Sequence, residues 1–245
     1  MKTQVQVRFT EFFEKWLHQN EESLKHLISV KRDSSHENEH RLLISAIMNH
    51  YKGYYSTKWA CVHEDVLGFF SPPWLTPLEN AYLWMTGWKP SLLYRLLTTL
   101  NHGTSRMKLT EDQLEKMEKL RCRTGLEEEK VEREMERQQV SMADRKMVEL
   151  ARLQSRLRNG ETGSEVEELV QVAMKVLVSA LEKIVKTADC VRLKALKGVL
   201  EILTPLQCVD FMAAFLMLQI QMRRLGKRKD HDQLMLNSIN KQLVM

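Results

Sequence analysis

The segment Ser164–Leu200, SEVEELVQVAMKVLVSALEKIVKTADCVRLKALKGVL, carries the most apolar helical pattern of this 245-residue chain. Its apolar residues recur at spacings of three and four, which places them on one face of an α-helix. A helix of this length indicates a protein built from long helices. The residues of this face are Val166, Leu169, Val170, Ala173, Val176, Leu177, Ala180, Leu181, Ile184 and Val185, followed by Leu193, Leu196, Val199 and Leu200.

Helix starts are marked by capping boxes, in which a Ser or Thr and a Glu or Gln three residues later cap the first turn reciprocally. The box that follows the quoted segment opens a final helix, which we expect to stop at Gly226. The stretch Asn159–Gly163 before the segment is predicted to be a linker. The four boxes are Thr76–Glu79, Thr110–Gln113, Ser164–Glu167 and Thr204–Gln207.

Apolar residues at helical spacing also predict the other helices. A helix over Gln4–Val30 is followed by the polar stretch Lys31–Glu39, where Ser34 or Ser35 could cap the next one. Further helices are expected up to Phe70 with a bend near Gly53, over Pro77–Thr86, from Pro90 to a loop at Asn101–Lys108, and over Glu111–Arg158 with a break near Gly125.

The pattern predicts an all-α fold, because no stretch alternates at the period of two that marks a strand. We expect a single elongated helical bundle of about seven to eight helices, with long antiparallel helices. The domain is predicted over residues 4–226, and residues 227–245 are predicted to form a basic, frayed C-terminal tail.

Composition indicates a protein of the nucleus or cytoplasm. The four cysteines lie far apart, which excludes a disulfide framework and suggests a reducing compartment. No signal peptide precedes the first helix. The longest apolar run, Phe211–Met222, is shorter than the roughly 20 residues of a membrane span, so we expect no membrane association.

The net charge of +5 is unevenly placed. A cationic patch near the C-terminus is a candidate nuclear-import signal or anion-binding patch, although cations at the end of a helix also stabilise its dipole. Specific DNA binding by this chain alone is not expected, because the long helix after Thr110 mixes acids with bases. The patch consists of Arg223, Arg224, Lys227, Arg228 and Lys229.

One motif of catalytic type is present. His36 to His40 reads H-E-x-x-H, which in zinc proteases places two histidine ligands on one helix face beside a glutamate base. The surrounding residues are polar, and no second motif supplies a third ligand. We therefore predict two solvated histidines and keep a zinc hydrolase through His36 and His40 as a remote alternative. The sequence predicts no catalytic residue, no metal and no cofactor.

Aromatic residues concentrate between Trp59 and Tyr94. They are expected to form a core, or alternatively a pocket or partner groove. Trp74, Trp84 and Trp88 are the candidates for such a surface, with Trp74 and Trp88 the more exposed.

Several motifs together resemble the plant Delay-of-Germination domain, from about Phe9 to Gly226. The W-x-T-P-x-E and W-x-x-G-W-x-P-S portions are the most specific. Arg95, within the matching stretch, joins the candidate partner surface. The matching residues are His50-Tyr51, Lys58, Asp65-Val66, Trp74–Ala81, Leu83–Trp88, Pro90-Ser91, Arg95-Leu96, Ala188-Asp189, Arg192-Leu193, Leu203–Gln207 and Asp210-Phe211.

The resemblance implies a helical, non-enzymatic regulatory protein of plants. The same domain ends TGA-type bZIP transcription factors, where it recruits partner proteins. Stand-alone members act in seed dormancy, abscisic acid and stress responses, and pollen aperture formation. Since the chain begins almost at the domain, we expect no bZIP region. The resemblance thus predicts an interaction module that binds other proteins and could self-associate. The alternative is a sensor whose core, adaptable through its 14 methionines, binds an apolar small molecule.

Overall fold

The computed structural model describes residues 2–103, 107–145, 147–149, 151–152 and 164–243. Within this part the chain is helical, and its one β-type contact is an isolated bridge between Trp84 and Gly87. The all-α prediction is confirmed. The helices are α1 (Gln4–Ser29), the 3-10 turn η1 (Ser34–His36), α2 (Glu37–Glu64), α3 (Val66–Phe70), α4 (Pro77–Ala81), α5 (Leu92–Gly103), α6 (Glu111–Ser141), α8 (Ser164–Ile202) and α9 (Pro205–Leu243).

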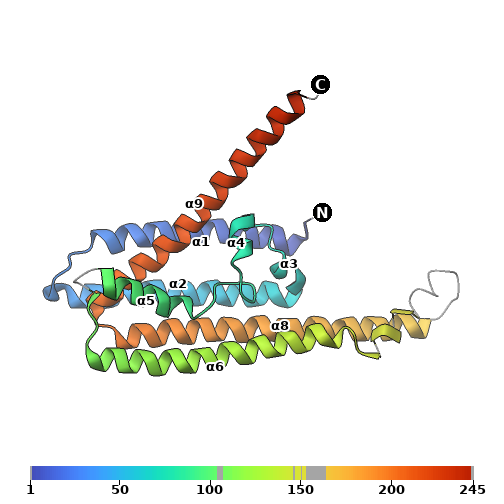
Figure 1. The fold of residues 1–245 in the computed structure, drawn as a ribbon, viewed down its shortest axis with the longest axis horizontal. Helices are drawn as coiled ribbons and strands as arrows, with labels where there is room; N and C mark the ends of the chain where they lie inside the picture. Colours follow the sequence, from blue (N-terminus) through green and yellow to red (C-terminus); the bar gives the residue numbers. More distant parts are fainter. Residues whose placement is uncertain (1, 104–106, 146, 150, 153–163, 244–245) are drawn as a thin grey trace.

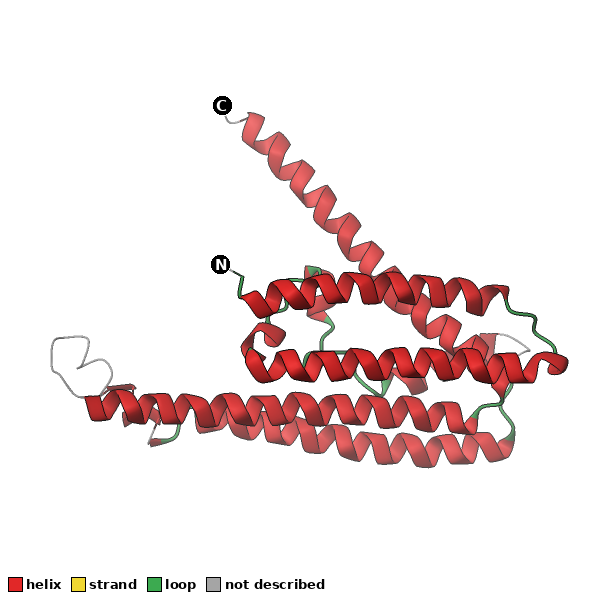
Figure 2. Ribbon diagram, turned by 180° about the vertical axis from the view of Figure 1, so that it is seen from behind, coloured by secondary structure: helices red, strands yellow, loops and turns green. Residues whose placement is uncertain are grey.

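The long helices pack as two antiparallel pairs with a fifth helix crossing one of them. α1 lies against α2, and α6 lies against α8 (Figure 1). α9 crosses α1 and α2 obliquely, and its C-terminal part projects away from the bundle, as the view from behind also shows (Figure 2). The paired α6 and α8 extend past the other helices at one end (Figure 1). The predicted elongated bundle with long antiparallel helices is therefore confirmed.

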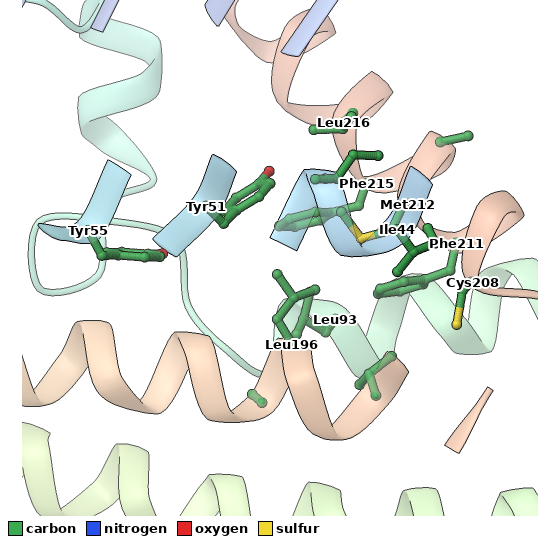
Figure 3. Close-up of a cluster of buried hydrophobic side chains, with 14 of the residues drawn as sticks. Ile44, Tyr51, Tyr55, Leu93, Leu196, Cys208, Phe211, Met212, Phe215 and Leu216 are labelled. Atoms are coloured by element: carbon green, nitrogen blue, oxygen red, sulfur yellow. The ribbon is translucent and has the colours of Figure 1, made fainter. Parts of the chain in front are cut away.

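The main core lies where α1, α2, α5, α8 and α9 meet. Tyr51 of α2, Leu93 of α5, Leu196 of α8 and Phe215 of α9 are all nearly or fully buried within it (Figure 3). The segment Pro205–Asp232 of α9 is long and apolar enough to span a membrane by length and composition alone, and half of its most apolar window is buried inside the bundle. We interpret it as a core helix.

Three predicted capping boxes are present. Thr76, Thr110 and Thr204 each accept a hydrogen bond from the backbone N–H three residues later. The two glutamines of the last two boxes also meet, because Gln113 Nε2 donates to Gln207 Oε1 at 2.8 Å. This contact joins the first turns of α6 and α9. The fourth predicted box depends on the side chain of Ser164, which the structure does not describe.

Several predicted boundaries in the first half of the chain are wrong. α2 ends at Glu64 because Asp65 leaves the helical region and its carboxylate caps α3 by accepting from Gly68 N at 3.0 Å. α2 continues through Gly53 without interruption. Asp33 accepts from Ser35 N and caps the η1 turn, and the N-cap position of α2 itself is His36. α4 ends at Ala81, because the backbone turns back between Trp84 and Gly87.

Boundaries in the second half also differ. α5 continues to Gly103, past the expected start of the loop at Asn101. α6 passes Gly125 without a break and ends at Ser141, where a turn follows; residues 153–158 of its predicted end and the linker 159–163 lie outside the described residues. α9 passes Gly226 and continues to Leu243, so Gly226 does not stop it. The division into a domain and a separate tail remains a prediction.

Candidate functional site

A buried cluster of charged side chains connects α2 with α8. Lys58 Nζ donates to Asp189 Oδ1 at 2.9 Å, and Trp59 Nε1 donates to the other carboxylate oxygen at 3.1 Å. Arg192 forms a salt bridge with the same carboxylate from the next turn of α8. The side chains of Lys58, Asp189 and Arg192 are at most 1% exposed. Three of the residues that carried the family resemblance thus meet at one point.

The loop Trp84–Trp88 is wrapped around the Arg192 guanidinium. Arg192 Nε donates to the Trp88 carbonyl at 2.6 Å, and Nη2 donates to the carbonyls of Trp84 and Met85. A Cβ at Gly87 would lie 2.7 Å from Arg192 Cζ, so only glycine permits this approach. Met85 and Thr86 adopt positive φ angles of 44° and 63°, which close the loop.

Acidic residues of α6 hold the other side of this loop. Glu132 accepts hydrogen bonds from Trp84 Nε1 at 2.8 Å and from Lys89 Nζ at 2.7 Å. Glu128 accepts from the backbone N–H of Ser91 at 2.6 Å, just before α5 begins. The loop is therefore clamped between Arg192 of α8 and these two glutamates.

The cluster contains two cations and one anion, so it carries a surplus positive charge inside the protein. Burial lowers the pKa of the Lys58 ammonium to about 8; Asp189 opposes this shift and Arg192 adds to it. Lys58 Nζ also donates to the Thr86 carbonyl at 3.2 Å. The four loop carbonyls supply negative dipole ends, which offset part of the cost of burying the surplus charge.

A cavity of about 620 Å³ lies beside the cluster, between α1, α2, α4 and α9. This volume is within the range of small-molecule sites, and the wall is rich in aromatic side chains, with Lys58 and Asp189 at one side. Tyr51 and Phe215, from α2 and α9, are seen in Figure 3. The aromatic residues of the wall are Phe13, Trp16, Tyr51, Tyr54, Tyr55, Phe69, Trp74, Tyr82, Trp88 and Phe215.

Two polar atoms of residues in the cavity wall are buried without a hydrogen-bond partner in the described structure: Trp16 Nε1 and Thr86 Oγ1. A buried donor without a partner costs about 1–3 kcal/mol. By contrast, Tyr51 donates its hydroxyl to Gln219 Oε1 at 2.9 Å. Burial raises the pKa of the Tyr51, Tyr54 and Tyr55 hydroxyls, so the wall contributes neutral phenols at physiological pH.

Of the four residues of the predicted partner surface, only Arg95 is exposed. Trp74 is 6% exposed, so the expectation that it is exposed is wrong. Trp74 and the half-buried Trp88 line the cavity, and Trp88 packs edge-on against Phe215. Trp84 covers the Arg192 guanidinium at 5.2 Å. Arg95 is exposed on α5 and is not part of the cavity wall.

One residue of the predicted cationic patch, Arg223, is buried. Arg223 is 7% exposed, forms salt bridges with Glu14 and Glu79, and donates to the Trp74 carbonyl at 2.8 Å. It therefore joins α9 to α1 and α4 and is not available at the surface. Arg224, Lys227, Arg228 and Lys229 are exposed. Of these, Arg224 pairs with Glu21 at 3.1 Å and Lys227 lies 4.0 Å from Glu14.

The two histidines of the zinc-type motif have structural partners. His36 Nδ1 lies 2.6 Å from Asp33 Oδ1 in the η1 turn. His40 is 1% exposed and donates from Nε2 to the Lys31 carbonyl at 2.7 Å, so the prediction that it is solvated is wrong. Among the described residues no group of three His, Cys, Asp or Glu side chains is arranged to hold a metal ion.

Sequence patterns alone did not single out the ion cluster or the α6 glutamates. A signal for the cluster exists, since Lys58 and Arg192 interrupt otherwise apolar helix faces. Glu128 and Glu132 carry a weaker signal, because the apolar seam of their helix is thin and charged residues surround it.

Comparisons with known proteins give consistent matches. A family model described as DOG1, seed dormancy control, matches residues 20–99. Protein DOG1-like 4 of Arabidopsis thaliana is 50% identical to the chain, over 94% of the chain and 97% of that protein. Protein ZW2 of the same plant is 30% identical over 89% and 96%. The Arabidopsis transcription factor TGA2 is 26% identical over 79% of the chain and 56% of that factor.

Proposed function

This chain belongs to the DOG1 family, and we propose that it is a non-enzymatic regulatory protein that binds other proteins in transcription-linked or hormone and stress signalling of plants. The similarity over almost the whole chain to a DOG1-like protein carries the proposal. Two further relatives support it by name: Protein RESPONSE TO ABA AND SALT 1, at 29% identity, and transcription factor TGA2. The expected location is the nucleus, the cytoplasm or both.

The chemistry of the described residues agrees with a role in recognition. The most strongly buried charged groups, Lys58, Asp189 and Arg192, bind one another and the loop Trp84–Trp88. They hold helices together and position a loop. In the proposed mechanism this rigid bundle presents its outer helix faces, including Arg95 of α5, to partner proteins.

Proximity labelling in plant cells tests this proposal. The wild-type chain is compared with Arg95→Glu, which changes an exposed charge, and with the matched control Lys52→Glu on the exposed face of α2. We expect a reproducible set of regulatory proteins, part of which is lost only with Arg95→Glu. Labelling that is indistinguishable from that of an unrelated helical protein would contradict the function. Equal loss with both variants would contradict the role of Arg95.

A second candidate function is a sensor for an apolar small molecule, and the cavity of about 620 Å³ favours it. The apolar and aromatic side chains of the wall would bury an apolar ligand, and Lys58 and Asp189 add charged groups at one side. Ligand occupancy would stabilise the packing of α9 on α1 and α2, and so couple the ligand to the outer faces.

Native mass spectrometry of the purified protein tests the sensor. Leu218→Trp places a larger side chain at the cavity wall, and Met217→Trp is the control, because the neighbouring Met217 is equally exposed and does not line the cavity. We expect a retained mass in the wild type and in Met217→Trp, and less of it in Leu218→Trp. A wild-type protein with no retained mass, or equal retention by Leu218→Trp, would contradict this function.

A further inference from the structure

The N-terminal half of α8 carries an apolar stripe on its outer surface. Leu169, Val172 and Val176 are 56%, 61% and 65% exposed. Their spacings of three and four residues place them along one side of the helix, in the a–d–a positions of a heptad. Soluble proteins rarely expose a continuous apolar surface unless it binds something. We define these three residues as the α8 stripe.

We propose that the α8 stripe is an interface between two copies of this chain, in which the two α8 helices pack antiparallel. The proposal goes beyond the proposed function, because the partner is a second copy of this chain. A two-fold axis across the stripe would cover Leu169, Val172 and Val176 of each copy with the same residues of the other, as a symmetric dimer requires.

Charges beside the stripe select this partner and this orientation. Glu168 and Lys175 are exposed, lie on the same edge of the stripe and are one heptad apart, about 10.5 Å along the helix. Neither has an ion-pair partner among the residues that the structure describes. Antiparallel pairing brings each Glu168 beside Lys175 of the partner subunit, which forms two interchain ion pairs. Parallel pairing would place Glu168 and Lys175 of the two copies on opposite sides of the interface and form neither ion pair.

The position of the stripe leaves room for a second copy. It lies on the part of α8 that extends, with α6, past the other helices of the bundle (Figures 1 and 2). A second α8 can therefore lie along it while the two bundles point in opposite directions. Because the contact is a short pair of helices, we expect a reversible dimer with a dissociation constant on the order of 10 µM.

Light scattering after gel filtration, over a range of protein concentrations, measures the first consequence. The wild type should shift with concentration from the chain mass of 28.8 kDa towards twice that mass. Val172→Glu should remain monomeric, with an unchanged helical circular dichroism spectrum because the residue is exposed. Leu42→Glu, which alters a similarly exposed residue of α2, should dimerise like the wild type. A wild type that is monomeric throughout, or a dimer that survives Val172→Glu, overturns the proposal.

Charge reversal provides a second and sharper test. Glu168→Lys and Lys175→Glu should each weaken the dimer about tenfold, because each replaces two attractive pairs with two repulsive ones. The double variant Glu168→Lys/Lys175→Glu restores both attractive pairs and should dimerise within about threefold of the wild type. Failure of the double variant to recover would overturn the antiparallel arrangement.

The dimer and the proposed regulatory function can be refuted independently of each other. A monomer that still labels regulatory proteins in plant cells would refute the dimer and keep the proposed function. A dimer that labels no regulatory protein would refute the proposed function alone.

Discussion

Gly226 of α9 lies directly against Thr76, the N-cap of α4: a methyl carbon at position 226 would lie 2.1 Å from Thr76 Oγ1. The same hydroxyl accepts from Glu79 N at 3.2 Å, and Glu79 pairs with Arg223 at 3.1 Å. The start of α4 is therefore pressed onto α9 at a glycine. Trp74, Leu75 and Glu79, on either side of this contact, line the cavity.

Gly226→Ala is expected to destabilise the protein. Alanine is the better helix former by about 1 kcal/mol, but its methyl group would push Thr76 off α9 and break the capping box, at a net cost of about 1–3 kcal/mol. Denaturant unfolding followed by circular dichroism measures this. Gly125→Ala is the control, since a methyl group there meets nothing within 4 Å. It should stabilise the protein by up to about 1 kcal/mol. Equal effects at both glycines would contradict the proposed contact.

Asp189→Asn should cost more than any other single substitution in the ion cluster. It leaves Lys58 and Arg192 as two buried cations without an anion, a loss of about 3–5 kcal/mol. Lys58→Met should cost less, because Asp189 and Arg192 remain as a neutral pair. Chemical unfolding of the two variants gives the ranking. If Lys58→Met proved the more destabilising, the surplus positive charge could not be the dominant cost.

The pH dependence of stability should report Lys58. Its pKa is about 8 in the folded protein and 10.5 in an ordinary lysine, so between these values the unfolded chain binds more protons. The free energy of unfolding of the wild type, relative to that of Lys58→Met, should therefore rise between pH 8 and pH 10.5. When the pH is lowered again, this gain should be lost by about pH 8. Taking this difference removes the contribution of the tyrosines to the pH dependence, because they titrate in both proteins. A constant difference across this window would contradict the lowered pKa.

The exposed cations of α9 are expected to support nuclear import. Arg228→Gln/Lys229→Gln, in a fluorescent fusion too large for passive diffusion, should lower the ratio of nuclear to cytoplasmic signal. Arg228 and Lys229 are exposed, and substituting them leaves the buried Arg223 in place. Lys116→Gln/Lys119→Gln on α6, which removes the same charge elsewhere, is the control. An unchanged ratio for the α9 variant would show that these cations have another role.

The capping boxes show that local sequence patterns can predict where helices start. Thr76, Thr110 and Thr204 start helices as predicted, because a cap depends on residues within four positions of one another. Gly226 was misread as a helix stop for the complementary reason. Its role depends on Thr76, which is 150 residues away in the sequence and touches it only after folding.

The residues of the candidate site could likewise be predicted only in part from the sequence. Trp74 and Trp88 could be selected from the sequence as aromatic residues of a core or pocket, and the family motif marked Lys58, Asp189 and Arg192 without giving them a role. Only the packed structure shows that these charges form one cluster and that the loop Trp84–Trp88 closes on it.

The sequence by itself determined the helical class, most helix starts and the family, because periodicity, caps and motifs are encoded locally. The tertiary structure decided which charges are buried together, that Arg223 is internal, and that the cavity and the α8 stripe exist. These properties depend on contacts between helices, and side chains on separate helices approach one another only when their apolar faces pack.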